Sequence, residues 1–223
     1  MNRYISYIKY ILIISCVIFI AAGCSKKPKP DIGYKELLQM GLKKLKDGNP
    51  TQALAMLQTV KDRYPYTDSA VVASLKLADT YYELKEYDSA YDLYDEFERY
   101  HPKEADIPYV KYQKAMCNFV RIRSFDRDQS HVQKAKEEFE KLINQFPTGE
   151  YTLMARRHLR ECLLKLAQFE IYTGNFYFNQ KKYISAMQRY KYAIHNFPDV
   201  GQYHDALEKI NKCQIKLAEI RKK

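Results

Sequence analysis

Apolar side chains recur at intervals of three and four residues along most of this chain, which is the spacing of an amphipathic α-helix. Short polar turns rich in Gly, Pro and Asp separate these segments. We find no alternation of apolar and polar residues of the kind that predicts a half-buried strand. The pattern predicts an all-α fold, with helices near Tyr34–Asp47, Thr51–Tyr64, 68–85, Ser89–Tyr100, Ile107–Arg123, Val132–Phe146, Tyr151–Gln180, Ile184–Phe197 and Gln202–Ile220.

One short pattern occurs four times along these helices. An Ala is followed four residues later by an apolar or aromatic residue, and twelve residues after the Ala by a Pro. Ala lets a neighbouring helix approach closely, the residue at i+4 lies on the same helix face, and Pro ends the helix. The four copies are Ala53–Leu57–Pro65, Ala90–Tyr94–Pro102, Ala135–Phe139–Pro147 and Ala186–Tyr190–Pro198.

The residues upstream of each copy extend the pattern. Twelve residues before the four Ala residues stand Gly41, Ala78, Arg123 and Gly174. Three residues after each of these positions, toward the C-terminus, stand Lys44, Tyr81, Asp126 and Tyr177. A small residue, then Tyr, then Ala-x3-aromatic and Pro is typical of tetratricopeptide repeats, which are helix–turn–helix units of 34 residues. The third copy therefore fails at both upstream positions, and the first lacks the Tyr.

These repeats predict a tetratricopeptide-repeat α-solenoid of about five irregular helix–turn–helix units in residues 34–223. The prolines are 37, 45 and 51 residues apart, so the units are longer than the standard repeat. A non-repeating helical bundle is the alternative. The expected units lie near 34–65, 71–102, 107–147 and 152–198, followed by a capping helix at 202–220.

Two local features refine this expectation. The polar stretch Ser124–His131 stands where a turn of two or three residues is expected, and inserted loops in repeat proteins often lie on a binding face. Thr67 or Asp68 can cap the helix that follows, and Thr152 is a candidate cap for the long fourth-unit helix.

The first 23 residues are typical of a signal peptide. Arg3 and Lys9 precede an apolar run from Tyr10 to Ala22 that is too short for an ordinary spanning helix. The sequence Ala-Ala-Gly-Cys at its end resembles the lipobox of bacterial lipoproteins, so Cys24 is the expected lipidation site, although an ordinary secretory signal is an alternative. Residues 24–33, with Pro and Lys, predict an extended tether. Ser25, where an Asp would favour the inner membrane, points to the outer membrane.

Cysteine usage and charge narrow the class of protein. Cys117, Cys162 and Cys213 stand far apart within helical patterns, so we expect small buried core residues, although a disulfide between two of them stays possible. The net charge is +10, and without Arg3 and Lys9 it is 10 − 2 = +8. Because the chain leaves the cytoplasm and has no recognition motif, we expect contact with a membrane surface or acidic partners rather than nucleic acid.

No motif for chemistry emerges. The chain has no Gly-rich phosphate loop, no nucleophile elbow and no metal-binding helix motif, and its five His residues are scattered. We therefore expect no enzyme, no catalytic residue, no metal and no cofactor apart from the lipid on Cys24. Exposed Tyr and Arg on a concave helical stack instead favour a surface that binds peptides or proteins.

The assembled chain resembles the BamD family, the outer-membrane lipoproteins of the β-barrel assembly machinery. The resemblance is carried by Asp62-Arg63-Tyr64-Pro65-Tyr66, by Asp126-Arg127-Asp128 with His131, by Leu166-Ala167 and Phe169-Glu170 leading to Phe176-Tyr177, and by Gln188-Arg189. It implies a scaffold, anchored in the outer membrane and facing the periplasm, that binds a BamA-type barrel protein, other assembly lipoproteins and the C-terminal targeting peptides of unfolded outer-membrane proteins.

The same resemblance implies roles for individual residues. Arg189 matches an Arg on the BamA-facing side, and Asp126, Arg127 and Asp128 match an inserted partner or regulatory loop. Arg63, Tyr64 and Tyr66 lie in the region of substrate-peptide docking. Two alternatives stay open: another periplasmic repeat lipoprotein of a cell-envelope or motility complex, and a helper that presents a substrate to an enzyme.

Overall fold

The structure, a computed structural model, describes residues 32–198 and 200–222, and this part of the chain contains helices and no strand. Its helices are α2 (Tyr34–Lys46), α3 (Pro50–Arg63), α4 (Asp68–Glu83), α5 (Tyr87–Tyr100), α6 (Ile107–Phe119), α7 (Ser130–Gln145), α8 (Glu150–Asn179), α9 (Tyr183–Asn196) and α10 (Tyr203–Arg221). The all-α expectation is confirmed.

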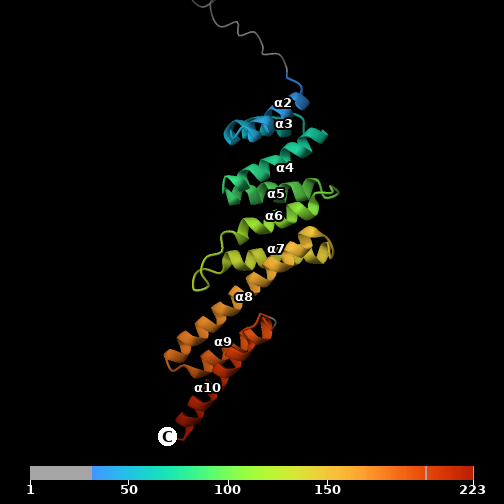
Figure 1. The fold of residues 1–223 in the computed structure, drawn as a ribbon. Helices are drawn as coiled ribbons and strands as arrows, with labels where there is room; N and C mark the ends of the chain where they lie inside the picture. The colour runs from blue at the N-terminus through green and yellow to red at the C-terminus, as the bar shows by residue number, and fades with distance from the viewer. Residues whose placement is uncertain (1–31, 199, 223) are drawn as a thin grey trace, which may run out of the picture.

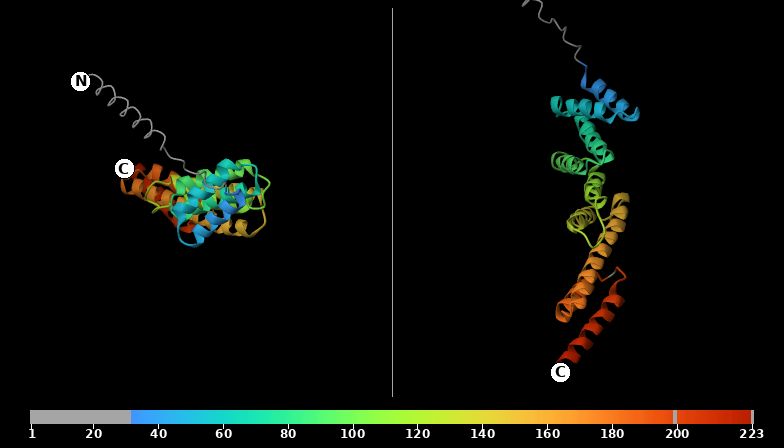
Figure 2. Two further views of the ribbon diagram at one scale, coloured as in Figure 1. Left: turned by 90° about the horizontal axis from the view of Figure 1, so that it is seen from above. Right: turned by 90° about the vertical axis from the view of Figure 1, so that its left-hand side faces the viewer.

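The helices stack in chain order into an elongated solenoid, from α2 at one end to α10 at the other (Figures 1 and 2). Each helix packs chiefly on its neighbours in sequence, and α4 and α8 also contact the first helix of the preceding unit, α2 and α6 respectively. The buried side chains accordingly form four separate clusters along the stack. This is the quasi-one-dimensional packing of a repeat protein, and it confirms the tetratricopeptide solenoid.

The repeated Ala residues mark the contact between the two helices of each pair. Ala53, Ala90, Ala135 and Ala186 are all completely buried. The residue four positions later packs against the small residue of the partner helix: a Cβ added to Gly174 would lie 2.4 Å from Cε1 of Tyr190. Only a residue without a side chain leaves room for the Tyr190 ring at that point.

The same kind of hydrogen bond occurs within unit two and within unit four, and the sequence pattern did not reveal it. Tyr94 donates its hydroxyl to Asp79 Oδ1 at 2.9 Å, and Tyr190 donates to Asn175 Oδ1 at 2.8 Å. In both pairs the acceptor directly follows the small residue, Ala78 or Gly174, so the buried phenol finds its partner at the same place in each unit.

The third unit corrects two expectations. Its first helix ends at Phe119 rather than Arg123, because the chain turns with hydrogen bonds from Arg121 N to Asn118 O and from Ile122 N to Phe119 O. The small residue that packs into this pair is Ala115, which is completely buried in the same cluster as Phe139. Ala115 precedes Ala135 by 20 residues, so 20 − 12 = 8 inserted residues displaced the sequence count onto Arg123 and Asp126.

The fourth unit begins with the expected long helix, and α8 spans 30 residues, or roughly 45 Å at 1.5 Å per residue. Thr67 caps α4 by accepting a hydrogen bond from Ala70 N at 3.2 Å, as expected. Thr152, however, is not a cap. It lies inside the first turn of α8, after the N-cap residue Gly149, and donates its hydroxyl to Phe146 O at 2.6 Å, which fastens the preceding turn to the helix.

Cys117, Cys162 and Cys213 are buried free thiols, in agreement with the expectation of small core residues. Each belongs to a different core cluster, so no two of them are placed to form a disulfide.

A buried ion network joins the second and third units. Lys114 of α6 donates to Asp95 Oδ1 and Glu98 Oε2 of α5, both at 2.9 Å, and lies 3.5 Å from Glu138 Oε2 of α7. Lys111 also pairs with Glu98. Lys114 and Glu138 are 6 % and 7 % exposed, so their charges depend on one another for compensation.

Candidate partner-binding sites

Among residues 32–198 and 200–222, no helix combines the length and the apolar character needed to cross a lipid bilayer. In the same residues, no three His, Cys, Asp or Glu side chains are grouped so that they could hold a metal ion. Cys24, the expected lipidation site, lies outside the described residues.

The insert loop, residues 120–129, is held in shape by two of its own side chains. Gln129 donates its amide to Phe125 O at 2.9 Å and to Arg127 O at 2.7 Å. Asp128 accepts hydrogen bonds from the backbone N–H of Ser130, at 3.0 Å, and from its hydroxyl, at 2.6 Å. The hydrogen bond from the Ser130 hydroxyl has the largest effect in lowering the pKa of Asp128 below its usual value, and the bond from the Ser130 backbone N–H adds to it.

Among the charged residues of this loop, Asp126, Arg127 and Asp128 differ in role. Asp128 fastens the start of α7. Asp126 and Arg127 are exposed, and the pKa of the Asp126 carboxyl is lowered chiefly by a hydrogen bond from Ser124. Asp128 and Arg123 are also exposed, so a partner can reach all four of these charged side chains.

The insert loop packs on the fourth unit rather than standing free. Phe125 lies edge-on to Tyr172 of α8, with ring centroids 5.8 Å apart. Gln129 of the loop and Tyr192 of α9 line one cavity, which we call the insert cavity, between the loop, α7, α8 and α9. The structure thus brings the predicted loop close to the helix that carries Arg189.

Arg189 of α9 forms an ion pair with Glu170 of α8, which also lines the insert cavity. Arg189 Nη1 lies 3.1 Å from Glu170 Oε2 and 3.5 Å from Oε1. The Arg189 side chain is 43 % exposed and that of Glu170 only 11 %. Because a guanidinium has five N–H donors, Arg189 can hold Glu170 and still donate to a carboxylate of a partner.

Sequence reasoning did not assign a role to Glu170. The helical spacing places it on α8, but only the packing of α9 across α8 brings its carboxylate to Arg189. The run of Phe169-Glu170 quoted for the family resemblance was the one available signal.

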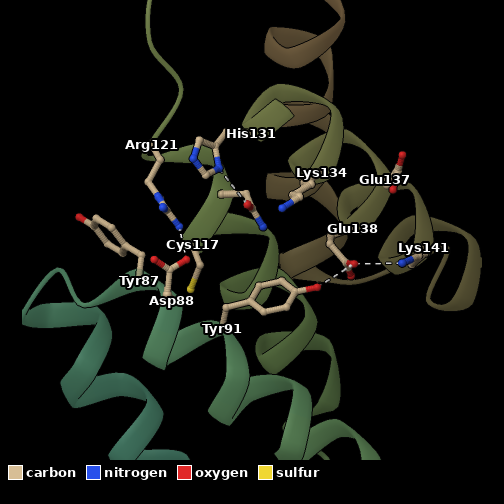
Figure 3. Close-up of a pocket in the computed structure, with 11 residues that line it drawn as sticks. Tyr87, Asp88, Tyr91, Cys117, Arg121, His131, Lys134, Glu137, Glu138 and Lys141 are labelled. Atoms are coloured by element: carbon tan, nitrogen blue, oxygen red, sulfur yellow. Dashed lines mark hydrogen bonds and ion pairs between the residues drawn. The ribbon is translucent and has the colours of Figure 1, made fainter. Parts of the chain in front are cut away.

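A second cavity, of about 450 Å³, lies between α5, α6 and α7 (Figure 3). Its charged side chains are largely paired with one another: Arg121 with Asp88, and Lys141 with Glu138, to which Tyr91 also donates at 3.3 Å. His131 Nδ1 lies 3.2 Å from Asn118 Oδ1.

Two groups of this second cavity have pKa values shifted by burial. Burial raises the pKa of the Cys117 thiol to about 12, so the thiol stays protonated and is a poor nucleophile. Burial, followed by the charges of Arg121 and Lys134, lowers the pKa of His131, so this imidazole is neutral at pH 7.

The segment from Arg63 to Tyr66 lies between α3 and α4, toward the N-terminal end of the stack (Figure 1). The Tyr64 ring packs on Tyr34, with centroids 5.4 Å apart, while Tyr66 is fully exposed at 100 % and Arg63 is also exposed. The structure therefore separates this segment from the insert loop and Arg189, and the molecule offers two distant surfaces.

Comparison with known proteins identifies relatives along nearly the whole chain. A family model described as "YfiO: Outer membrane lipoprotein" matches residues 30–223. The protein named "Outer membrane protein assembly factor BamD" from Vibrio cholerae serotype O1 is 25 % identical over 198 residues, which cover 83 % of this chain and 82 % of that protein. The protein of the same name from Rickettsia prowazekii is 27 % identical over 201 residues, covering 89 % and 80 % of the two chains.

Solved structures with a similar course of the chain include a tetratricopeptide repeat protein from Parabacteroides merdae. It is 13 % identical, with a TM-score of 0.47, and the match covers 99 % of this chain and 77 % of that one.

Proposed function

The chain belongs to the YfiO family of outer membrane lipoproteins, the family of its BamD relatives, and on that premise we propose that it is a non-enzymatic scaffold for the assembly of outer-membrane proteins. The observation that carries the proposal is the family match over residues 30–223, which includes the whole described solenoid. In this role the chain binds a BamA-type barrel protein, other assembly lipoproteins and C-terminal targeting peptides of unfolded outer-membrane proteins. Purification of the membrane-anchored chain tests the proposal, because a BamA-type barrel should copurify; its absence would leave another periplasmic repeat scaffold as the function.

The barrel-binding surface in this proposal is centred on Arg189, with Asp126 and Arg127 of the insert loop beside it. Two features support this placement: the half-exposed guanidinium, and the packing of the loop on α8 through Phe125 and Tyr172. We expect Arg189→Glu to abolish copurification of the barrel protein, because the variant replaces a donor with a carboxylate.

Arg189→Glu also places a carboxylate next to buried Glu170, so a neutral variant is needed beside it. Arg189→Gln keeps hydrogen-bonding capacity without the like-charge contact, and it should weaken copurification with unchanged helicity in circular dichroism. Undiminished copurification with both variants would remove Arg189 from the interface.

The peptide-binding surface in the proposal is the segment with Arg63, Tyr64 and Tyr66. Because Tyr66 is fully exposed, Tyr66→Ala should change the free energy of unfolding by less than about 0.5 kcal/mol. We expect it to weaken binding of a labelled C-terminal peptide of an outer-membrane protein about tenfold, as for an aromatic anchor in an interface, measured by fluorescence anisotropy. Tyr172→Ala, which changes a half-exposed tyrosine in the other half of the stack, is the matched control and should leave peptide binding unchanged.

Attachment to the outer membrane is proposed to occur through lipid on Cys24, with the repeats facing the periplasm. Two or more acyl chains anchor a protein stably, whereas one gives marginal binding. We expect Cys24→Ala to release the chain into the soluble periplasmic fraction. Cell fractionation with immunoblotting measures this release. A variant chain that still requires detergent for extraction would contradict this anchor.

A further inference from the structure

The insert cavity has a volume of about 280 Å³ and combines aromatic rings with hydrogen-bond acceptors. The rings come from α8, α9 and the turn after α9, and the acceptors come from the insert loop, α7 and α8. The side chains concerned are Phe169, Tyr192, Phe197, Gln129, Glu137 and Glu170.

One of these acceptors is a buried amide oxygen. The Gln129 amide has a defined orientation, because Phe125 O and Arg127 O can only accept and so require its Nε2. Its Oε1 then has no hydrogen-bond partner in the described part of the chain, although Gln129 is only 7 % exposed. A buried acceptor without a partner has lost its hydrogen bonds to water without replacement, so a donor bound at this cavity would offset that cost.

The charge of the cavity is opposite to that of the whole chain. Among the lining residues, Glu137 and Glu170 carry −2 and Lys136 carries +1, a net charge of −1, against +10 for the whole chain. Lys136 is already paired with Glu140 at 2.9 Å, whereas Glu137 has no ion pair among the described residues. Glu170 contacts one cation, Arg189, and a carboxylate can accept further hydrogen bonds.

We propose that the insert cavity binds an arginine side chain of the partner chain that docks on the Arg189 surface. A guanidinium offers several donors in one plane to acceptors on different walls, and it stacks on aromatic rings. This inference rests on the proposed function, and it adds that the partner presents an arginine to the insert cavity as well as a carboxylate to Arg189. Two opposite charges at neighbouring points set the register of docking.

The test uses N-acetyl-arginine amide as the probe and the full chain in detergent as the protein. The reporter is the side-chain amide resonance of Gln129 in ¹⁵N correlation spectra, assigned with Gln129→Asn. We expect a saturable shift of this resonance, a smaller one with N-acetyl-lysine amide, and none with N-acetyl-glutamate amide. No saturable shift with the arginine probe would overturn the proposal.

Two variants with the same change of charge distinguish binding at the insert cavity from attraction of the probe to the overall charge of the chain. Glu137→Lys places a cation at the cavity and should weaken binding of the arginine probe about tenfold. Glu83→Lys makes the same charge change on exposed Glu83, at the end of α4, and should leave binding unchanged. Equal weakening by the two variants would show attraction to overall charge only and would overturn the site.

The same measurements keep this inference apart from the proposed function. If a BamA-type barrel copurifies and the arginine probe does not bind, the insert cavity is excluded and the scaffold function stands. If the probe binds and no barrel copurifies, the cation site stands and the barrel partner is excluded.

Discussion

Gly174→Ala is expected to destabilise the fourth unit by about 2 kcal/mol, because the new methyl group overpacks the contact between α8 and α9. Its Cβ would lie 2.4 Å from Cε1 and 2.7 Å from Cδ1 of Tyr190. The ring cannot turn away without losing the hydrogen bond from its hydroxyl to Asn175. At an exposed helix position, a change from Gly to Ala would stabilise the fold by about 1 kcal/mol. A loss of stability in Gly174→Ala would therefore itself indicate the tight packing of Gly174 against Tyr190.

The measurement is urea denaturation followed by circular dichroism, with hydrogen exchange to locate the loss in α8–α10. Gly41→Ala is the matched comparison, since its Cβ would lie 3.1 Å from Cδ2 and 3.2 Å from Cγ of buried Leu57, a smaller overlap than at Gly174. Gly41→Ala should lose less stability than Gly174→Ala, because its overlap with the partner helix is smaller. A Gly174→Ala protein as stable as the Gly41→Ala protein would mean that the two helices separate at little cost.

Lys114→Met should lower the free energy of unfolding by about 3 kcal/mol, because it removes the cation that buried Glu138 shares with Asp95 and Glu98. Methionine fills a similar volume, so the loss reports the weakened pairing of these carboxylates rather than a cavity, although Arg99, Lys111 and Lys141 stay paired with Asp95, Glu98 and Glu138. Lys136→Met is the control: its pair with Glu140 is a partly exposed i, i+4 contact worth about 0.3–0.5 kcal/mol. Chemical denaturation at pH 7 compares the three proteins.

The same network predicts a pH dependence. A hydrogen bond from Lys114 lowers the pKa of Asp95. Burial by itself would raise the pKa of Glu98, but the hydrogen bonds from Lys111 and Lys114 outweigh it and lower this pKa. Because both folded-state pKa values lie below the unfolded ones, the network stabilises the fold above the ordinary carboxyl range and loses this contribution as the pH falls through it, from about pH 5 downward.

Lys114→Met should therefore lose less stability than the wild type between about pH 5 and pH 3. Parallel acid-denaturation curves for the two proteins would contradict the network as the source of the acid sensitivity.

The third unit shows where counting along the sequence stops being informative. The pair Ala135–Phe139 was recognised because both residues lie on one helix, where spacing is set by the helix itself. Its partner Ala115 was missed because the count crossed an insert of eight residues, and a loop has no fixed rise or period. The buried contact between Ala115 and the helix of Phe139 is a property of the folded pair.

The candidate sites divide in the same way. The sequence pattern identified Asp126, Arg127 and Arg189 as separate positions, through a resemblance that is carried by short motifs. Only the structure places Phe125 against Tyr172 and Glu170 against Arg189, because these contacts join residues that are 47 and 19 positions apart.

The sequence alone determined the helix pairs, their order and the family of this chain, because the 3.6-residue period, Ala, Gly and Pro act over one or two turns. Tertiary structure alone decided which charges are buried, how the insert loop lies on α8, and where the Gln129 amide oxygen is buried without a partner. Those outcomes depend on the approach of one unit to the next, and the chain encodes that approach through side chains too far apart in sequence for any local pattern to connect.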